Sequence, residues 1–348
     1  MDFRSDNTTG AAPEIMAALA AANAGSRNSY GDDEQTRRVE ARLKQIFETD
    51  LAAFFVATGT AANSLGLSLL ADPWSAIYCH EAAHIAVDEC GAPEFYTGGA
   101  KLISLPGEHG RISATQLATL LPGDKGVVHH SQPAAISLSQ ASEAGTCYRP
   151  ADISAIAEVA RAHGLRVHMD GARFANALAF LGASPAEISW RAGVDVLSFG
   201  ASKNGALAAE AVIIFDRSLA AEFAFRRKRG GHLFSKMRFL SAQLEAYLTD
   251  DLWFRHARHA NAMARRLADG LEELAGVQLC HPVEANEIFL HAPEALIRGL
   301  LDDGFQFYRW PDERSTRLRL VTAFDTSEAD VIALVASATR HAGASADR

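Results

Sequence analysis

The residues whose types and spacing suggest chemistry most clearly are an aspartate and a lysine, each placed after a short apolar run. Asp170 directly follows the apolar run 165–169, and Lys203 follows the run 194–199 after a short Gly-Ala-Ser segment. A lysine amine forms a Schiff base with an aldehyde cofactor, while an aspartate keeps a pyridine nitrogen protonated so that the ring withdraws electrons. The pair predicts a site for pyridoxal 5'-phosphate (PLP) bound covalently to Lys203.

A candidate phosphate site lies where a strand is expected to give way to a helix. Thr58, Gly59 and Thr60 stand between the apolar run 51–57 and a helix expected over 60–70. Backbone N–H groups at the start of a helix bind anions, and the two threonine hydroxyls would add donors. The same Thr-Gly-Thr segment also fits a plain helix cap. The sequence lacks the G-x-G-x-x-G pattern of nicotinamide and flavin proteins, and the lysine of 200–205 lies inside its glycine pair, unlike that of a P-loop.

The segment 80–84 reads His-Glu-Ala-Ala-His and matches a zinc-protease pattern. On a helix, His80 and His84 would share one face and Glu81 would serve as a base. The segment directly follows an expected strand, however, where a helix-borne site needs a longer helix. A histidine beyond the carboxyl end of a strand can instead lie over a planar cofactor, or simply on the surface. We expect no metal site, and keep a zinc hydrolase as a remote alternative.

Short apolar runs alternate with helical segments over the first two thirds of the chain. Helical spacing is clearest at Ile153, Ile156, Ala157 and Ala160, which would lie on one face. Continuous rather than alternating apolar strands are typical of a sheet covered on both faces. The pattern therefore predicts a mostly parallel, doubly wound α/β domain. The expected strands are 51–57, 76–79, 101–104, 126–129, 134–139, 165–169, 194–199 and 211–215.

The pattern changes after about residue 230. Helical periodicity runs over 233–274, strands are expected near 287–291 and 317–321, and a closing helix carries Val331, Leu334, Val335 and Ala338. We therefore predict a large α/β domain over 1–250, including the N-terminal segment. A small α+β C-terminal domain would follow over 251–348, joined to the large domain by a long helix.

Composition limits the classes of partner and the compartment. A net charge of −9 argues against nucleic-acid and anionic-membrane partners, and the basic run 226–229 is too short to define such a surface. Four scattered cysteines without a C-x-x-C pair suggest free thiols in a reducing compartment. The N-terminus carries acids where a signal peptide needs bases. We expect a cytoplasmic protein that acts on a small molecule.

Taken in order along the chain, these motifs resemble the L-threonine aldolases, a family of the aspartate aminotransferase (fold type I) superfamily of PLP-dependent enzymes. The resemblance covers nearly the whole length. It implies cleavage of L-threonine, L-allo-threonine or related β-hydroxy-α-amino acids to glycine and an aldehyde. It also implies a homotetramer or dimer whose active sites are completed by a neighbouring subunit. The motifs are the segments 2–7, 30–33, 58–63, 170–173, 202–203 and 317–322, together with His84.

The resemblance also assigns roles to individual residues. Lys203 would carry the cofactor, Asp170 would bind its pyridine nitrogen, and His84 would stack on its ring. Thr58, Gly59 and Thr60 would hold the phosphate. The substrate carboxylate would be held by Ser5, Arg173 and Arg319. Arg173 would also contact the cofactor, and Arg238 would reach the phosphate from the adjacent subunit.

Departures from the better-known branch of the family concern the β-hydroxyl contacts. Ser142 stands where a second active-site histidine is usual, so His84 is the candidate for the base or for orienting a water. The segment 236–240 is more similar to the branch that includes phenylserine aldolases, which makes aromatic β-hydroxy amino acids candidate substrates. The alternatives are a β-eliminating lyase or aminotransferase of the same fold, and a PLP-carrying protein without catalysis.

Overall fold

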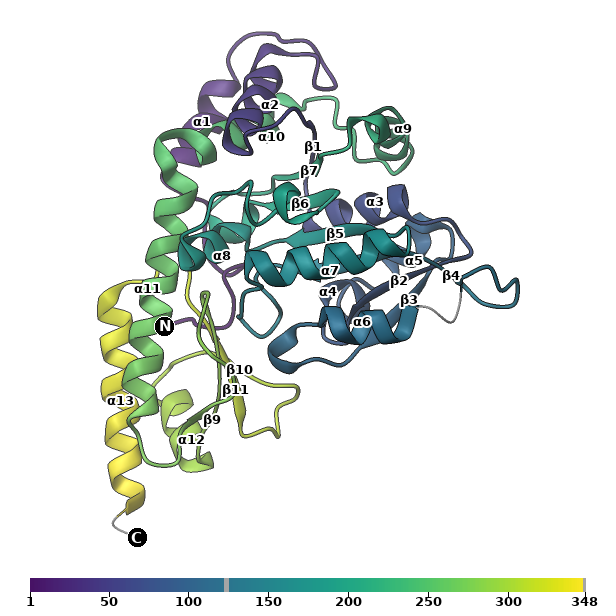
Figure 1. Cartoon of the computed structure of the whole chain (residues 1–348). Helices are drawn as coiled ribbons and strands as arrows, with labels where there is room; N and C mark the ends of the chain where they lie inside the picture. The colour runs from purple at the N-terminus through teal and green to yellow at the C-terminus, as the bar shows by residue number, and fades with distance from the viewer. Residues whose placement is uncertain (122–124, 347–348) are drawn as a thin grey trace.

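A seven-stranded sheet forms the centre of the larger part of the molecule, which is described here from a computed structural model covering residues 1–121 and 125–346 (Figure 1). Its strand order is β1-β7-β6-β5-β4-β2-β3. Neighbouring strands pair in parallel from β6 to β3, and β7 is antiparallel to both β6 and β1. The strands are β1 (Ala52–Val56), β2 (Ser75–His80), β3 (Lys101–Leu105), β4 (Gln132–Ser139), β5 (Arg166–Gly171), β6 (Val196–Gly200) and β7 (Glu210–Ile214).

Helices cover both faces of this sheet, which explains why β2, β6 and β7 are buried along their full length. Val196 and Val212 face α3 (Gly59–Leu70) and α9 (Ala220–Arg229), while their neighbours Leu197 and Ile213 face the opposite side. That opposite face packs on α2 (Glu34–Ile46), α7 (Pro150–Ala162), α8 (Phe174–Leu181) and α10 (Arg238–Leu248). The predicted mostly parallel, doubly wound architecture is confirmed.

The strand directions bring the chemically important segments to one edge of the sheet. Since β1, β2, β4, β5 and β6 point the same way, their carboxyl ends meet there. Thr58 follows β1, His84 follows β2, Asp170 lies at the end of β5 and Lys203 follows β6. In open parallel sheets, ligands bind outside this edge.

A four-stranded antiparallel sheet of order β10-β11-β9-β8 forms the second, smaller part. Its core includes Ile288, Leu318 and Leu334, and also Phe3 from the N-terminus, whose carbonyl accepts a hydrogen bond from the Val321 amide at 2.8 Å. The strands are β8 (Gln278–Leu279), β9 (Glu287–His291), β10 (Tyr308–Arg309) and β11 (Arg317–Val321), covered by α12 (Glu294–Asp302) and α13 (Glu328–Ala346).

One long helix, α11 (Leu252–Glu272), connects the two parts and runs beside α13 (Figure 1). Trp253 and Ala257 on its first turns belong to the core of the large sheet, whereas Ala264 and Leu267 belong to that of the small sheet. The division at residue 250 stays a prediction. The remaining helices are α1 (Pro13–Ala22), α4 (His84–Val87), α5 (Ala92–Thr97) and α6 (Ala114–Leu120). Within the described residues, no helix has both the length and the apolar character that a membrane crossing requires.

Two expectations about elements were wrong. Residues 126–129 form turns rather than a strand, because the Gln132 side chain bonds the Gly126 amide and the Val127 carbonyl. Val128 is 91% exposed there, so its apolar character signals no core position. The helix expected over 233–274 is interrupted at Thr249–Asp251, where Asp250 and Asp251 adopt positive φ angles of 50° and 53°. A left-handed pair cannot continue a right-handed helix.

Candidate active site

Two cavities meet at the carboxyl edge of the large sheet. The smaller, of about 390 Å³, is lined by the start of α3, by Asp170 and by Glu210. The larger, of about 850 Å³, extends to Ser5, Arg173 and Arg319 and opens between the two parts of the molecule. Both are lined by Asn7, His84, Glu143 and Lys203. These four residues therefore lie along the boundary between the cavities.

Lys203 lies on a single 3-10 turn, Ser202–Asn204, directly beyond β6. The next residue holds this turn: the Asn204 side-chain amide donates to the Tyr247 hydroxyl at 2.8 Å and to the Trp253 carbonyl at 2.7 Å. Within residues 1–121 and 125–346, the Lys203 amine has neither a hydrogen-bond nor an ion-pair partner. A fixed backbone thus presents an unpaired amine to both cavities.

Asp170 belongs to a hydrogen-bonded chain of side chains that reaches His84. One Asp170 oxygen accepts from the Ala172 amide at 2.9 Å, and the other accepts from Asn63 Nδ2 at 2.8 Å. Asn63 Nδ2 also lies 2.8 Å from Glu89 Oε1, which in turn lies 2.8 Å from His84 Nδ1. The hydrogen bond that His84 Nδ1 donates to Glu89 raises the pKa of His84, and burial raises the pKa of Glu89. This chain fixes the orientation of both Asp170 and the His84 ring.

A buried histidine lies two residues before Asp170 on β5. His168 Nδ1 is 2.9 Å from the Ser137 hydroxyl, and Nε2 is 3.1 Å from the Ser198 hydroxyl. Burial lowers the pKa of His168 to about 4, so the ring is neutral at neutral pH. It ties β5 to both neighbouring strands beneath the site. Sequence reasoning missed the roles of His168, Asn63 and Glu89, because their pairing depends on contacts between separate elements.

The start of α3 forms the far end of the smaller cavity. Thr58 is the N-cap, and its hydroxyl accepts a hydrogen bond from the Ala61 amide at 3.1 Å. A side chain at Gly59 would meet no atom within 4 Å, so the space beside the first turn is open. The predicted helix cap is thus present at Thr58, and Gly59 and Thr60 line the cavity beside it. That this turn binds an anion stays a prediction.

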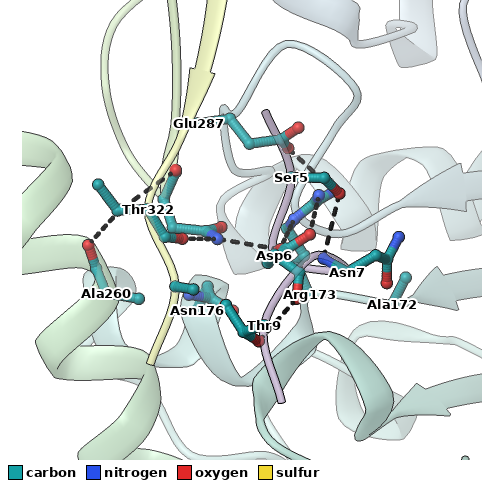
Figure 2. Close-up of polar contacts among 12 residues, drawn as sticks. Ser5, Asp6, Asn7, Thr9, Ala172, Arg173, Asn176, Ala260, Glu287 and Thr322 are labelled. Atoms are coloured by element: carbon teal, nitrogen blue, oxygen red, sulfur yellow. Dashed lines mark hydrogen bonds and ion pairs between the residues drawn. The ribbon is translucent and has the colours of Figure 1, made fainter. Parts of the chain in front are cut away.

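Arg173 in the larger cavity is already paired with carboxylates of the chain (Figure 2). Its Nε donates to Asp6 at 2.8 Å and its Nη2 donates to Asp6 at 2.9 Å, while Nη1 lies 3.1 Å from Glu287. Although burial alone lowers the pKa of Arg173, Asp6 and Glu287 raise it. Asn286 adds a hydrogen bond to Asp6 at 3.0 Å. This guanidinium is therefore held rigidly by buried charges.

Glu287 also contacts Arg319, so one carboxylate bridges two arginines. Arg319 Nη2 donates to Glu287 Oε1 at 2.6 Å, and Nη1 donates to the Arg4 carbonyl at 3.1 Å. Arg173 and Arg319 line the cavity beside Ser5, whereas Glu287 is buried behind them. The structure thus brings together the three residues predicted to bind the substrate carboxylate. Sequence reasoning did not find Asp6 and Glu287 as their partners.

Aromatic rings form the outer wall of the larger cavity. Phe289 has its ring centroid 5.8 Å from that of His281 and 6.3 Å from that of Trp310, and all three line the cavity. His281 Nδ1 lies 3.1 Å from Nδ1 of His109, which belongs to the large part. This wall offers apolar surface for a substrate side chain.

The structure bears on two further hypotheses from the sequence, which are the zinc site at His80 and His84 and the phosphate contact of Arg238. His80 ends β2 and His84 begins α4, so the two histidines do not share a helix face, and the zinc-protease interpretation loses its geometric basis. The His80 ring instead lies 3.1 Å from the Gly107 carbonyl and accepts from the Ala82 amide at 3.0 Å. Arg238 lies on a separate surface, where it donates to the Gly25 carbonyl at 2.9 Å. Its role across a subunit boundary stays a prediction.

The smaller cavity fits PLP in its donor set. An unpaired amine at Lys203, a carboxylate at Asp170 and open helix amides at Gly59 are the groups that its aldehyde, pyridine nitrogen and phosphate require. His84, oriented by Glu89, lines the same cavity. Bound there, the group would meet the larger cavity at Lys203.

The comparisons with known proteins agree with this geometry. A family model described as beta-eliminating lyase matches residues 2–295. The chain is 46% identical over 315 residues to the low specificity L-threonine aldolase of Pseudomonas aeruginosa, covering 90% of this chain and 91% of that protein. It is 43% identical to the low specificity L-threonine aldolase of Pseudomonas sp. strain NCIMB 10558, covering 96% of each. The solved threonine aldolase of Leishmania major superimposes with a TM-score of 0.92 at 28% identity, covering 98% of this chain and 99% of that one.

Proposed function

Because the chain belongs to the beta-eliminating lyase family and, within it, to the low specificity L-threonine aldolases, we propose that it cleaves the Cα–Cβ bond of L-β-hydroxy-α-amino acids. The products are glycine and an aldehyde, and the enzyme is a PLP-dependent carbon–carbon lyase. The observation that carries the proposal is the junction of the two cavities at Lys203. One cavity fits the cofactor, and the other contains a buried arginine, Arg173, and a half-buried one, Arg319, that are suited to an amino-acid carboxylate.

The cofactor-side residues act by holding charge in place. When bound, PLP supplies an electron sink for the pair released from the broken Cα–Cβ bond. Lys203 would hold it covalently, and the Asp170 carboxylate would accept a hydrogen bond from its pyridine nitrogen. The Asn63–Glu89–His84 chain keeps Asp170 and the His84 ring oriented. Such groups lower a barrier because they need no reorganisation during the reaction.

The substrate-side residues act by fixing rotation about Cα. Arg173 and Arg319 would bind the two oxygens of the substrate carboxylate, with the Ser5 hydroxyl beside them. Asp6 and Glu287 hold the Arg173 guanidinium, and Glu287 also holds that of Arg319, so both are fixed beside the cavity. A planar guanidinium matches the two oxygens of a carboxylate. A carboxylate anchored in this way selects which bond at Cα is aligned for cleavage, because orientation decides which bond overlaps with the ring.

Aromatic β-hydroxy amino acids are the finer substrate proposal. Phe289, Trp310 and His281 line the larger cavity near Arg319, and Arg319 stacks over Trp310 at 5.7 Å. A phenyl group at Cβ would pack against these rings and gain roughly 0.5–1.5 kcal/mol beyond area burial. We therefore expect L-phenylserine to be cleaved alongside L-threonine and L-allo-threonine.

A homo-oligomer that shares its active sites is the proposal for assembly. Phe95, Phe225 and Leu207 are 79%, 78% and 58% exposed, and Leu207 lines the smaller cavity. Large exposed apolar side chains favour a protein–protein contact. Arg238 would then reach the phosphate of the adjacent subunit. Light scattering that gives a monomer at micromolar concentration would count against this assembly.

Product analysis tests the activity. Purified protein loaded with PLP is incubated with L-threonine, L-allo-threonine and L-phenylserine, and glycine, aldehyde and keto acid are measured. Equal amounts of glycine and aldehyde are expected. Keto acid without aldehyde would instead indicate the β-eliminating lyase or aminotransferase alternative. Borohydride reduction followed by peptide mapping should place the cofactor on Lys203.

A further inference from the structure

Ser142 and Glu143 lie on the segment directly beyond β4. Ser142 is fully buried, and its hydroxyl donates to the His109 carbonyl at 3.0 Å and contacts the Thr146 hydroxyl at 2.9 Å. Those bonds give Ser142 a structural role in the loop. The side chain next to it has a different environment.

Glu143 lines both cavities, together with Asn7, His84 and Lys203. Over the described ranges 1–121 and 125–346, its carboxyl group forms no hydrogen bond and no ion pair. This sets it apart from Asp6, Glu89 and Glu287, whose carboxyl groups all hold a partner side chain. A half-buried carboxyl without a partner is costly unless a ligand uses it.

The charged groups around Glu143 suit proton transfer. Lys203 and Arg173 favour its ionised form, while Glu287 and Asp170 oppose it. Burial is the largest influence and raises the pKa of Glu143 above the ordinary value for glutamate. A carboxyl whose pKa lies closer to neutral accepts and returns a proton more readily at working pH.

His84 is less suited to the same task. Its Nδ1 lies 2.8 Å from Glu89, and this hydrogen bond raises the pKa of His84. With Nδ1 engaged by Glu89, only Nε2 of the ring is left to accept a proton. The ring also lines the smaller cavity, where stacking over the cofactor would occupy it.

We propose that Glu143 is the catalytic base that takes the proton from the substrate β-hydroxyl. The inference rests on the proposed aldolase function and names the group that this function still needs. The O–H electron pair becomes the second C–O bond of the aldehyde, the Cα–Cβ bond breaks, and its electron pair stays with Cα. The reaction balances when Glu143 releases the β-hydroxyl proton to solvent and Cα takes one proton from a separate donor, which completes glycine.

The test compares Glu143→Gln, Glu143→Asp and wild type, all loaded with PLP. Glu143→Gln should lower the kcat of L-threonine cleavage about 10²–10⁴-fold, the usual contribution of a general base. Exchange of the glycine Cα proton in D₂O, followed by NMR, should stay within about threefold, because glycine has no β-hydroxyl. Glu143→Asp should restore part of the cleavage. Glu108→Gln, at an exposed glutamate outside both cavities, is the matched control.

A spectroscopic titration provides a readout that does not depend on turnover. Because Glu143 faces Lys203, removing its charge should move the visible-absorption titration of the Lys203–cofactor linkage to lower pH. Glu143→Asp should move it less. An unmoved titration in Glu143→Gln, unchanged cleavage, or equal losses of cleavage and glycine exchange would each overturn the proposal. Absence of aldehyde from every β-hydroxy amino acid with wild type would instead overturn the proposed function itself.

Discussion

The two cavities that meet at Lys203 differ in whether their charged and polar groups are paired within the chain. In the larger one, Arg173 and Arg319 are paired with Asp6 and Glu287 before any substrate arrives. In the smaller one, the Lys203 amine and the buried Asn63 Oδ1 have no partner among the described residues. The charges of the larger cavity are thus compensated by carboxylates of the chain itself. The unpartnered groups of the smaller cavity gain partners only when the cofactor binds.

This difference has a consequence for stability. Buried ion pairs are strongly destabilising to break, since the remaining charge has no compensation. Unpartnered groups that a ligand satisfies make stability depend on the ligand concentration instead. Substitutions in the larger cavity should therefore affect folding with and without cofactor, and those at Lys203 should affect cofactor binding and chemistry.

Replacing Lys203 should abolish the reaction while the fold persists. Lys203→Ala removes the amine that both cavities share, and we expect kcat for L-threonine to fall by about 10⁴-fold or more, as for other central catalytic groups. The visible absorption of the covalent linkage should disappear, and the far-ultraviolet circular dichroism should not change. Lys101→Ala on the exposed position of β3 is the control. A variant with wild-type absorption would contradict this role for Lys203.

Breaking the buried ion pair of the larger cavity should cost folding free energy. Asp6→Ala leaves Arg173 buried with Glu287 as its remaining carboxylate, and we expect the free energy of unfolding to fall by about 3–5 kcal/mol. Urea unfolding without cofactor measures it. Asp2→Ala breaks the exposed Asp2–Arg4 pair and should cost less than about 1 kcal/mol. Equal losses of unfolding free energy in the two variants would show that burial does not make the Asp6 pair more important for stability.

A buried carboxyl in the smaller cavity should make stability depend on pH. Burial raises the pKa of Glu210 from 4.5 to about 7, so ionising it costs more in the folded state. Its contribution is complete below about pH 4.5 and is lost as pH rises through about 7, a loss of roughly 3 kcal/mol. Glu210→Gln should remove this dependence. Urea unfolding without cofactor at pH 5 and pH 8 should then give a smaller difference than in wild type, and an unchanged difference would contradict the assignment.

Replacing Arg319, which would bind the substrate carboxylate, should weaken substrate binding more than it slows the chemical step. Arg319→Lys keeps the charge but loses the planar fork, so KM for L-threonine should rise about tenfold, corresponding to one charge-assisted hydrogen bond. kcat should change less. Arg309→Lys, which alters a pair with Glu294 outside both cavities, should leave KM unchanged. A drop in kcat at constant KM would remove Arg319 from the carboxylate site.

Sequence reasoning succeeded where function follows strand order. Asp170 and Lys203 come at the ends of adjacent parallel strands, so a correct strand pattern was enough to place them at one edge. It failed where an apolar residue lies in a turn, as at Val128, because periodicity does not report exposure. It also missed Asp6, Glu89 and Glu287, since a lone acidic residue on a chain carries no sign of its partner.

The sequence by itself determined the doubly wound class and the family, and it predicted the cofactor pair and the phosphate turn. These follow from residue type, period and order along the chain, which are local properties. Only the tertiary structure decided which charges compensate one another. Arg173 between β5 and α8, Asp6 near the N-terminus and Glu287 on β9 meet because two separately packed cores place them together. Among the residues that the structure describes, the same packing leaves the Glu143 carboxyl without a partner at the boundary of the two cavities, because electrostatic pairing depends on distance in space rather than on separation in sequence.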